Sequence, residues 1–146
     1  MRYTNTQITF QEVPGLVTRC FSIANCGGKC KGCHSPELRK KNIGEELTIE
    51  VLDKYLKEDS HKVDCYVFLG DGREPNLMYV FLEYCKKHNM KTCIYLGHMK
   101  VFSPYLEIAD YIKVGCYRED LGGLDSPTTN QRMFKNITSE FYKPKK

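Results

Sequence analysis

The stretch of sequence that decides the fold reads Val63-Asp64-Cys65-Tyr66-Val67-Phe68-Leu69, and Gly70-Asp71-Gly72-Arg73-Glu74-Pro75 follows it directly. The first part is almost continuous in apolar and β-prone residues, which is typical of a strand that is covered on both faces. The second part combines two glycines and a proline with charged residues, a composition that favours a turn. Together they predict a buried strand of a parallel sheet that ends in a tight loop.

Segments of the same two kinds alternate on both sides of this stretch. Helix ends are marked by three residues. Thr48 is expected to cap the start of a helix, and Asn89 can end another helix in a left-handed conformation. Ser103 is expected to cap a short helix that begins at Pro104. Such alternation predicts an α/β fold in which crossover helices join the strands of a mostly parallel sheet. Strands are expected at 8–13, 16–23, 63–69, 92–96 and 111–114, and longer helices at 48–58 and 76–88.

The length of 146 residues suits one domain with its own core. A complete eight-stranded (βα) barrel takes about 250 residues, so this chain supplies roughly half of one. We therefore expect an open partial barrel, with a core at about 8–116 and an irregular tail at 117–146, where Gly122-Gly123 and Ser126-Pro127 favour loops.

Composition narrows the class of protein. A net charge of +4 is too small for the basic surface of a nucleic-acid-binding protein. The sequence contains neither a long apolar run nor an apolar signal core at its start, so we expect a cytoplasmic protein that does not enter the membrane. Eight cysteines then favour metal or redox chemistry over disulfides. Five of them stand singly among apolar residues and are expected to pack as small hydrophobic side chains: Cys20, Cys65, Cys85, Cys93 and Cys116.

The other three cysteines lie together in Cys26-Gly27-Gly28-Lys29-Cys30-Lys31-Gly32-Cys33. Three thiolates on one short loop can hold three irons of a cubane cluster and leave the fourth iron open to a ligand. A structural zinc site needs a fourth ligand, and His34 is adjacent to Cys33 and thus awkwardly placed for a shared tetrahedron. The string from Cys30 to His34 also matches a haem-attachment motif, and Cys30 with Cys33 matches a redox dithiol, but neither uses Cys26.

Three loops are expected at one edge of the sheet, because ligands of parallel sheets bind at the carboxyl ends of the strands. The cysteine loop follows the strand that ends near Ile23, the loop of Gly70 follows the strand that ends at Leu69, and Gly97 follows Leu96. This placement predicts a single site at that edge.

The cysteine spacing, after the first long strand of an α/β chain, resembles the radical S-adenosylmethionine superfamily. Gly32, the segment Cys33-His34-Ser35-Pro36-Glu37-Leu38 and the short chain resemble, more narrowly, the activating enzymes of anaerobic ribonucleoside-triphosphate reductase. The stretch Ser126-Pro127-Thr128-Thr129-Asn130-Gln131-Arg132 resembles the C-terminal signature of the same group, and the resemblance spans roughly residues 10 to 135.

The resemblance implies that Cys26, Cys30 and Cys33 hold a [4Fe–4S] cluster whose open iron binds the amino and carboxylate groups of S-adenosylmethionine. The backbone at Gly32, Cys33 and His34 would then approach the adenine end of this cofactor.

The family also carries two adjacent glycines, an acidic residue and a proline, which position the amino group of the methionine moiety. This chain departs from that pattern, because it has Gly70 and Gly72 without an adjacent pair. Asp71 and Glu74 both remain candidates for the acidic role, and each also suits a polar turn or a helix N-terminus.

The implied activity is that of a glycyl-radical activating enzyme. An electron from a small donor protein or another reductant would cleave S-adenosylmethionine, and the resulting 5′-deoxyadenosyl radical would take a hydrogen atom from a backbone glycine of the anaerobic reductase. Two alternatives stay open at this point: an activator of another glycyl-radical enzyme of the formate-lyase type, although those chains are usually longer, and a non-enzymatic module with a structural zinc.

Overall fold

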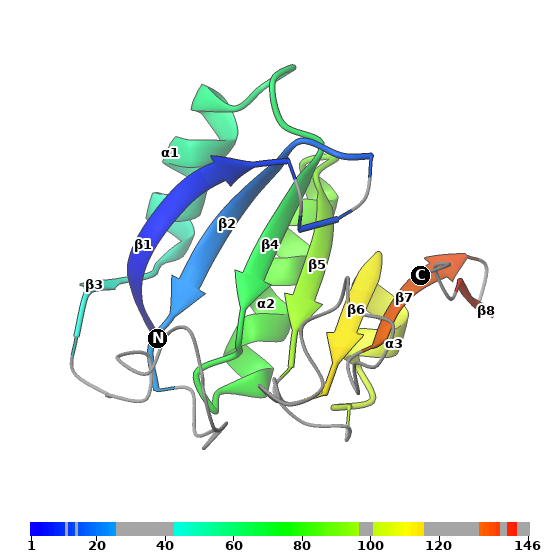
Figure 1. Cartoon of the computed structure of the whole chain (residues 1–146). Coiled ribbons are helices and arrows are strands. Elements are labelled where there is room, and N and C mark those ends of the chain that lie inside the picture. Colours follow the sequence, from blue (N-terminus) through cyan, green and yellow to red (C-terminus); the bar gives the residue numbers. More distant parts are fainter. Residues whose placement is uncertain are drawn as a thin grey trace, which may run out of the picture.

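The computed structural model describes residues 1–10, 12–13, 15–25, 43–96, 101–115, 132–137 and 140–142. Its strands form one eight-stranded sheet (Figure 1). In spatial order they are β3 (Glu45–Glu46), β1 (Arg2–Thr9), β2 (Thr18–Ile23), β4 (Cys65–Leu69), β5 (Lys91–Tyr95), β6 (Tyr111–Val114), β7 (Arg132–Ile137) and β8 (Glu140–Tyr142).

The centre of the sheet is parallel and its two sides are antiparallel. β2, β4, β5 and β6 are neighbours in chain order and run in the same direction. β1 and β3 add antiparallel strands on one side, and β7 and β8 add them on the other. The predicted α/β class with a largely parallel centre is therefore confirmed. Among the described strands the order starts at β3 and ends at β8 without closing, so this sheet is open.

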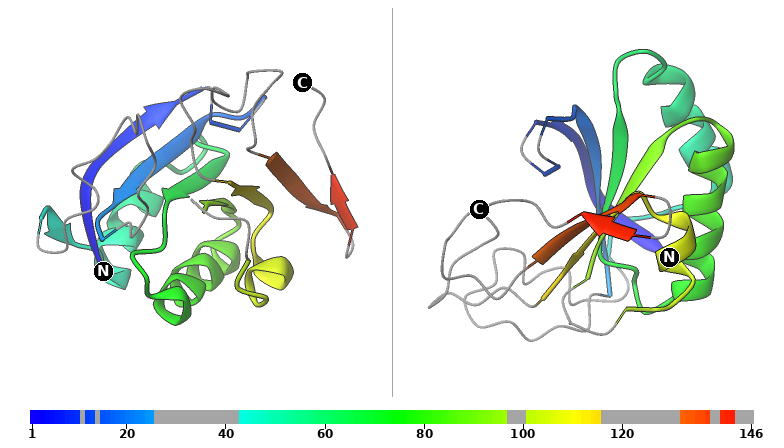
Figure 2. Two further views of the ribbon diagram at one scale, coloured as in Figure 1. Left: turned by 60° about the horizontal axis from the view of Figure 1, so that its bottom comes forward. Right: turned by 90° about the vertical axis from the view of Figure 1, so that its right-hand side faces the viewer.

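The described helices all cover one face of the sheet (Figure 2). They are α1 (Ile49–Glu58), α2 (Pro75–Lys87) and α3 (Tyr105–Ile108). The predicted cap of α1 is confirmed, because Thr48 Oγ1 accepts a hydrogen bond from the Val51 N–H at 3.2 Å. Asn89 also takes the expected left-handed conformation after α2, with φ of 60°. No helix in the described part of the chain is both long and apolar enough to cross a membrane.

The cap predicted for the third helix is wrong. Pro104 and not Ser103 is the N-cap residue of α3, and no side chain caps this helix. Backbone carbonyls bind the first N–H groups instead, because Phe102 accepts from Tyr105 at 2.9 Å and Ser103 accepts from Leu106 at 3.0 Å.

Two apolar clusters pack on the two faces of the sheet. The larger one lies under the helices and includes Phe21, Phe68 and Leu82. The smaller one lies on the helix-free face, by which we mean the sheet face opposite the described helices. It contains Cys20, Cys65 and Cys93 and is partly covered by Val13 and Leu16 from the β1–β2 connection.

The expectation for the single cysteines is confirmed for Cys20, Cys65, Cys85 and Cys93, which are all buried. Burial raises the pKa of each of these thiols, to about 12 for Cys85, and so keeps it protonated. Cys116 lies outside the described residues.

The edges of the sheet differ from the prediction because polar strands carry a weak sequence signal. The first strand covers Arg2–Thr9 and not 8–13, and it begins before the predicted core. Its Asn5 and Gln7 are exposed, as suits a strand near the sheet's edge, and pairing with β2 supplies its backbone hydrogen bonds. The second strand begins at Thr18 rather than at residue 16.

The tail at 117–146 was expected to be irregular, and this is wrong where the structure describes it. β7 pairs with β6, and Ile112 lies opposite Phe134. β8 then pairs with β7. These strands are short and depend on partners elsewhere in the sheet, so their own sequence did not reveal them.

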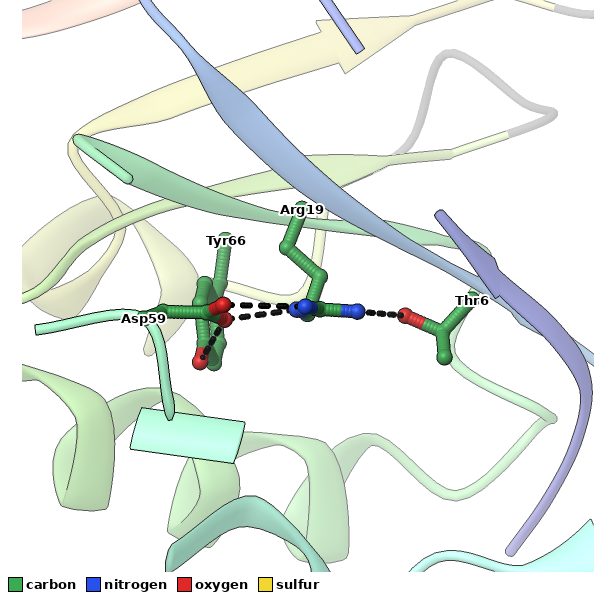
Figure 3. A network of polar contacts seen from close by, with 4 residues as sticks. All are labelled: Thr6, Arg19, Asp59 and Tyr66. Atoms are coloured by element: carbon green, nitrogen blue, oxygen red, sulfur yellow. Dashed lines mark hydrogen bonds and ion pairs between the residues drawn. The ribbon is translucent and has the colours of Figure 1, made fainter. Parts of the chain in front are cut away.

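Asp59 fixes the end of α1 to the sheet (Figure 3). Arg19 donates two hydrogen bonds to its carboxylate, from Nε at 2.5 Å and from Nη2 at 2.9 Å, and the Tyr66 hydroxyl donates a third at 2.6 Å. Arg19 Nη1 also reaches Thr6 Oγ1 at 3.3 Å. Arg19 and Tyr66 are the second residues of their strands, so this network holds the sheet together at the end away from the strands' carboxyl ends.

Candidate functional site

The carboxyl ends of β2, β4, β5 and β6 point to the same edge of the sheet (Figure 1). The described residues at this edge are Ala24 and Asn25 after β2, residues 70–74 after β4, Leu96 after β5 and Gly115 after β6. The predicted cluster ligands Cys26, Cys30 and Cys33, together with Gly32 and His34, lie outside the described residues, and so does Gly97. The structure thus describes the strand ends beneath the predicted site and one of its loops, residues 70–74.

The glycine loop, residues 70–74, is tightly turned. Gly70 and Gly72 have positive φ angles of 102° and 63°, which favour glycine at both positions. Arg73 also has a positive φ, 61°, although it carries a side chain. Its N–H donates to Asp71 Oδ1 at 3.1 Å, a local bond that stabilises the turn. The Gly70 N–H donates to the Tyr95 carbonyl at 2.9 Å and so ties the loop to β5.

The glycine loop packs against the residues that lead into the cysteine motif. Asn25 Nδ2 donates to the Gly72 carbonyl at 3.1 Å, and Asn25 itself has a positive φ of 63°. A Cβ atom on Gly72 would lie 3.2 Å from Ile23 Cγ2 and 3.3 Å from the Ala24 carbonyl. Because Asn25 immediately precedes Cys26, the two predicted site segments meet at this contact.

The two candidate carboxylates have different partners. Asp71 Oδ2 accepts a hydrogen bond from the Tyr105 hydroxyl at 2.8 Å, and burial together with this carboxylate raises the pKa of Tyr105. Glu74 is about half exposed, and its Oε2 lies 3.2 Å from the amino group of Met1. Asp71 is thus engaged in shaping the loop, whereas the Glu74 carboxylate pairs with a primary α-amino group.

Lys113 is a feature of the site that our sequence reading missed. It lies between Ile112 and Val114, which pack under the helices, so its own side chain emerges on the helix-free face. Its Nζ is 4.4 Å from the centre of the Tyr95 ring. Burial lowers the pKa of Lys113 to about 8. The only signal in the sequence is one lysine within the apolar strand Tyr111-Ile112-Lys113-Val114.

Tyr95 links Lys113 to the β1–β2 connection. The Tyr95 hydroxyl donates to the Glu12 carbonyl at 2.5 Å and lies 3.5 Å from Glu12 Oε2. Burial and the nearby acidic groups raise the pKa of Tyr95, so it remains a neutral phenol. The hydrogen bond to Glu12 therefore fixes the Tyr95 ring, and the face of this ring contacts the Lys113 ammonium group.

No group of three or more His, Cys, Asp or Glu side chains within the described ranges could hold a metal ion. The predicted iron ligands are not among those residues, so this finding does not bear on them. A comparison with protein-family models finds no match, and a comparison with curated proteins finds none either.

Proposed function

We propose that this protein is a radical S-adenosylmethionine enzyme that activates a glycyl-radical enzyme, and that its partner is the anaerobic ribonucleoside-triphosphate reductase. The main support is the position of the cysteine motif. Its first cysteine follows Asn25, at the carboxyl edge of a parallel sheet, and Asn25 is bonded to the glycine loop that resembles the family's cofactor-binding segment. Cys26, Cys30 and Cys33 would hold the [4Fe–4S] cluster.

Several described residues fit the cofactor. The space beside Gly70 is open, because a Cβ atom there would meet only Ile23 Cβ, at 4.0 Å, whereas the space beside Gly72 is filled by Ile23 and Ala24. Glu74 is the N-cap residue of α2 and is about half exposed, so its carboxylate is accessible to a ligand at this edge. When they are bound, the cluster and S-adenosylmethionine supply the reductive cleavage that yields the 5′-deoxyadenosyl radical. The chain's own residues bind and orient the cofactor, with Glu74 as our preferred acidic group.

The open order of the described strands supports a protein partner. We propose that β2, β4, β5 and β6 form part of a (βα) barrel whose missing wall is provided by the reductase. A partial barrel alone leaves the cofactor accessible to water, whereas a docked protein substrate can exclude water and bring its glycine close. An electron from a small donor protein or another reductant would start the reaction.

Metal analysis of anaerobically purified protein is the first test. The proposal expects iron and acid-labile sulfide, and zinc in their place would favour the structural zinc module. Electron paramagnetic resonance of the reduced protein should then change when S-adenosylmethionine is added, because the cofactor binds the open iron. Cys33→Ala should abolish the cluster signal, while Cys93→Ala, a buried cysteine of β5, should keep it.

The partner is tested separately. Reduced, cluster-loaded protein is mixed with the anaerobic reductase and S-adenosylmethionine, and the expected result is a glycine-centred radical on the reductase. Cleavage of the cofactor without that radical would contradict the choice of reductase and would favour another glycyl-radical partner, such as a formate-lyase type enzyme.

A further inference from the structure

Tyr105, the first residue of α3, connects the crossover after β5 to the glycine loop. α3 lies between β5 and β6 in the chain, yet the Tyr105 hydroxyl reaches back to the loop after β4 and donates to Asp71 Oδ2 at 2.8 Å. The two residues are 34 positions apart in the sequence. This single bond therefore joins two neighbouring crossovers near the carboxyl edge of the sheet.

The side chain of Tyr105 is held in place around this bond. Tyr105 is fully buried, and its ring packs edge-to-face against the Phe102 ring with the ring centres 5.2 Å apart. Burial and the Asp71 carboxylate raise the pKa of Tyr105, so the phenol remains a protonated donor at neutral pH. A buried hydroxyl that lost its acceptor would be unfavourable, which keeps the donor directed at Asp71.

Asp71 transmits this anchorage to the turn that carries Glu74. Its Oδ1 accepts the Arg73 N–H at 3.1 Å, and its backbone carbonyl accepts the Glu74 N–H at 3.0 Å. With Oδ2 bonded to Tyr105, both carboxylate oxygens of Asp71 have partners within the protein. Asp71 thus fixes the turn from both its side chain and its backbone.

Glu74 is the residue that this turn positions. It is the N-cap residue of α2, but its side chain forms no capping hydrogen bond, and it is about half exposed. A fixed turn restricts the directions in which its carboxylate can point. A binding group that is already oriented loses less conformational entropy when a ligand arrives, so the anchorage at Asp71 favours binding.

We propose that Tyr105 is a positioning residue for the cofactor. Through Asp71 it holds the glycine loop so that the Glu74 carboxylate meets the amino group of S-adenosylmethionine. This inference rests on the proposed function. Because Tyr105 acts through the loop, loss of its hydroxyl should weaken recognition of the amino group and leave the contacts to the rest of the cofactor unchanged.

The test is equilibrium binding by calorimetry under anaerobic conditions, with the cluster loaded and oxidised so that no cleavage occurs. The probes are S-adenosylmethionine and its analogue with hydrogen in place of the α-amino group. Tyr105→Phe keeps the ring and removes only the hydroxyl. We expect it to weaken binding of S-adenosylmethionine roughly three- to tenfold, the range of one hydrogen bond, and to leave the affinity for the analogue unchanged.

Two further variants show whether the effect passes through Asp71. Asp71→Ala should weaken binding with the same selectivity, and Tyr105→Phe should have no further effect in that background, because the bond is already absent. Tyr84→Phe is the matched control. It also removes a hydroxyl that donates to an aspartate, Asp53 Oδ1 at 3.0 Å, but near the other end of α2, so it should change neither affinity.

The possible outcomes separate the two proposals. If the unaltered protein binds S-adenosylmethionine and Tyr105→Phe binds it equally well, the role of Tyr105 is refuted while the proposed function stands. An equal loss for both probes, at unchanged iron content, would show general damage to the pocket and would also refute it. If the analogue binds too weakly to measure, or if Tyr105→Phe does not fold, the variants at Asp71 decide in the same way: a further loss in the double variant, or full affinity in Asp71→Ala, refutes the role. If the unaltered, cluster-loaded protein binds neither probe, both proposals fail together.

Discussion

Lys113→Met should make the ligand-free protein more stable at pH 7. The pKa of Lys113 falls from its ordinary value of 10.5 to about 8 in the folded protein. At 1.36 kcal/mol for each pH unit, this gap corresponds to about 3 kcal/mol by which folding is disfavoured while the lysine is charged. The cation–π contact with Tyr95 offsets about 0.5 to 1 kcal/mol of it. Methionine has a similar length and no charge, so we expect a net gain of about 2 kcal/mol.

The sign of this effect also fixes its dependence on pH. Below pH 8 the lysine is charged in both the folded and the unfolded protein, so the full penalty applies. Between 8 and 10.5 the folded protein loses the proton first, and the penalty shrinks as the pH rises. The advantage of Lys113→Met should therefore fall to about half near pH 9.5 and disappear above the ordinary lysine pKa.

Urea unfolding of the ligand-free protein and the variant, at pH 7 and pH 9.5, measures this difference directly. Lys91→Met serves as the control, because Lys91, at the start of β5, is exposed and its removal should change the free energy of unfolding little. A variant that is less stable than the parent at pH 7, or a gain that is independent of pH, would refute the reasoning. A confirmed gain would identify Lys113 as a residue kept at the expense of stability, as binding residues often are.

Three further predictions concern other parts of the molecule. Asp59→Ala should destabilise the protein by about 3 to 5 kcal/mol in urea unfolding, because it leaves the partly buried Arg19 and the buried Tyr66 hydroxyl without their acceptor. A loss below about 1 kcal/mol would contradict the role of this network. Gly72→Val should leave the iron content intact but weaken binding of S-adenosylmethionine. Valine disfavours a φ of 63°, and its Cβ would press on Ile23 and Ala24, so the glycine loop would have to shift. Unchanged affinity in calorimetry would show that the glycine loop is not part of the site. Cys33→Ala should prevent cluster assembly, which an analysis of iron and sulfide would show as their loss. Cys85→Ala should keep the cluster and reduce the free energy of unfolding by roughly 1 to 3 kcal/mol. A full iron complement in the Cys33→Ala variant would mean that the motif has another role.

The sequence predicted those elements whose signals are local. Thr48 caps α1 through its own hydroxyl, Asn89 ends α2 in the left-handed region, and β4 is marked by a run of apolar residues. Each of these features depends on the residues themselves and their nearest neighbours. Sequence reasoning was therefore sufficient for the parallel centre of the sheet.

The elements that it missed depend on distant partners. β1 is polar and becomes a strand by pairing with β2, and β7 becomes one by pairing with β6. Within the site, the sequence did not reveal that the hydroxyl of Tyr105 engages Asp71, because the two residues are far apart in the chain. Lys113 was missed because one lysine in a strand is common, and only the fold shows that it lies over Tyr95 without a counter-ion in the described region.

The hydrogen bond from Asn25 to the Gly72 carbonyl has a consequence for attempts to transplant this chemistry. Asn25 sets the direction in which the chain leaves β2, just before the first cysteine, and the backbone of Gly72 holds it there. If only the cysteine segment were transferred to another protein, it would lack Asn25, the residue that sets its direction. A functional graft should include both segments, with Asn25 retained as the donor to the backbone of residue 72.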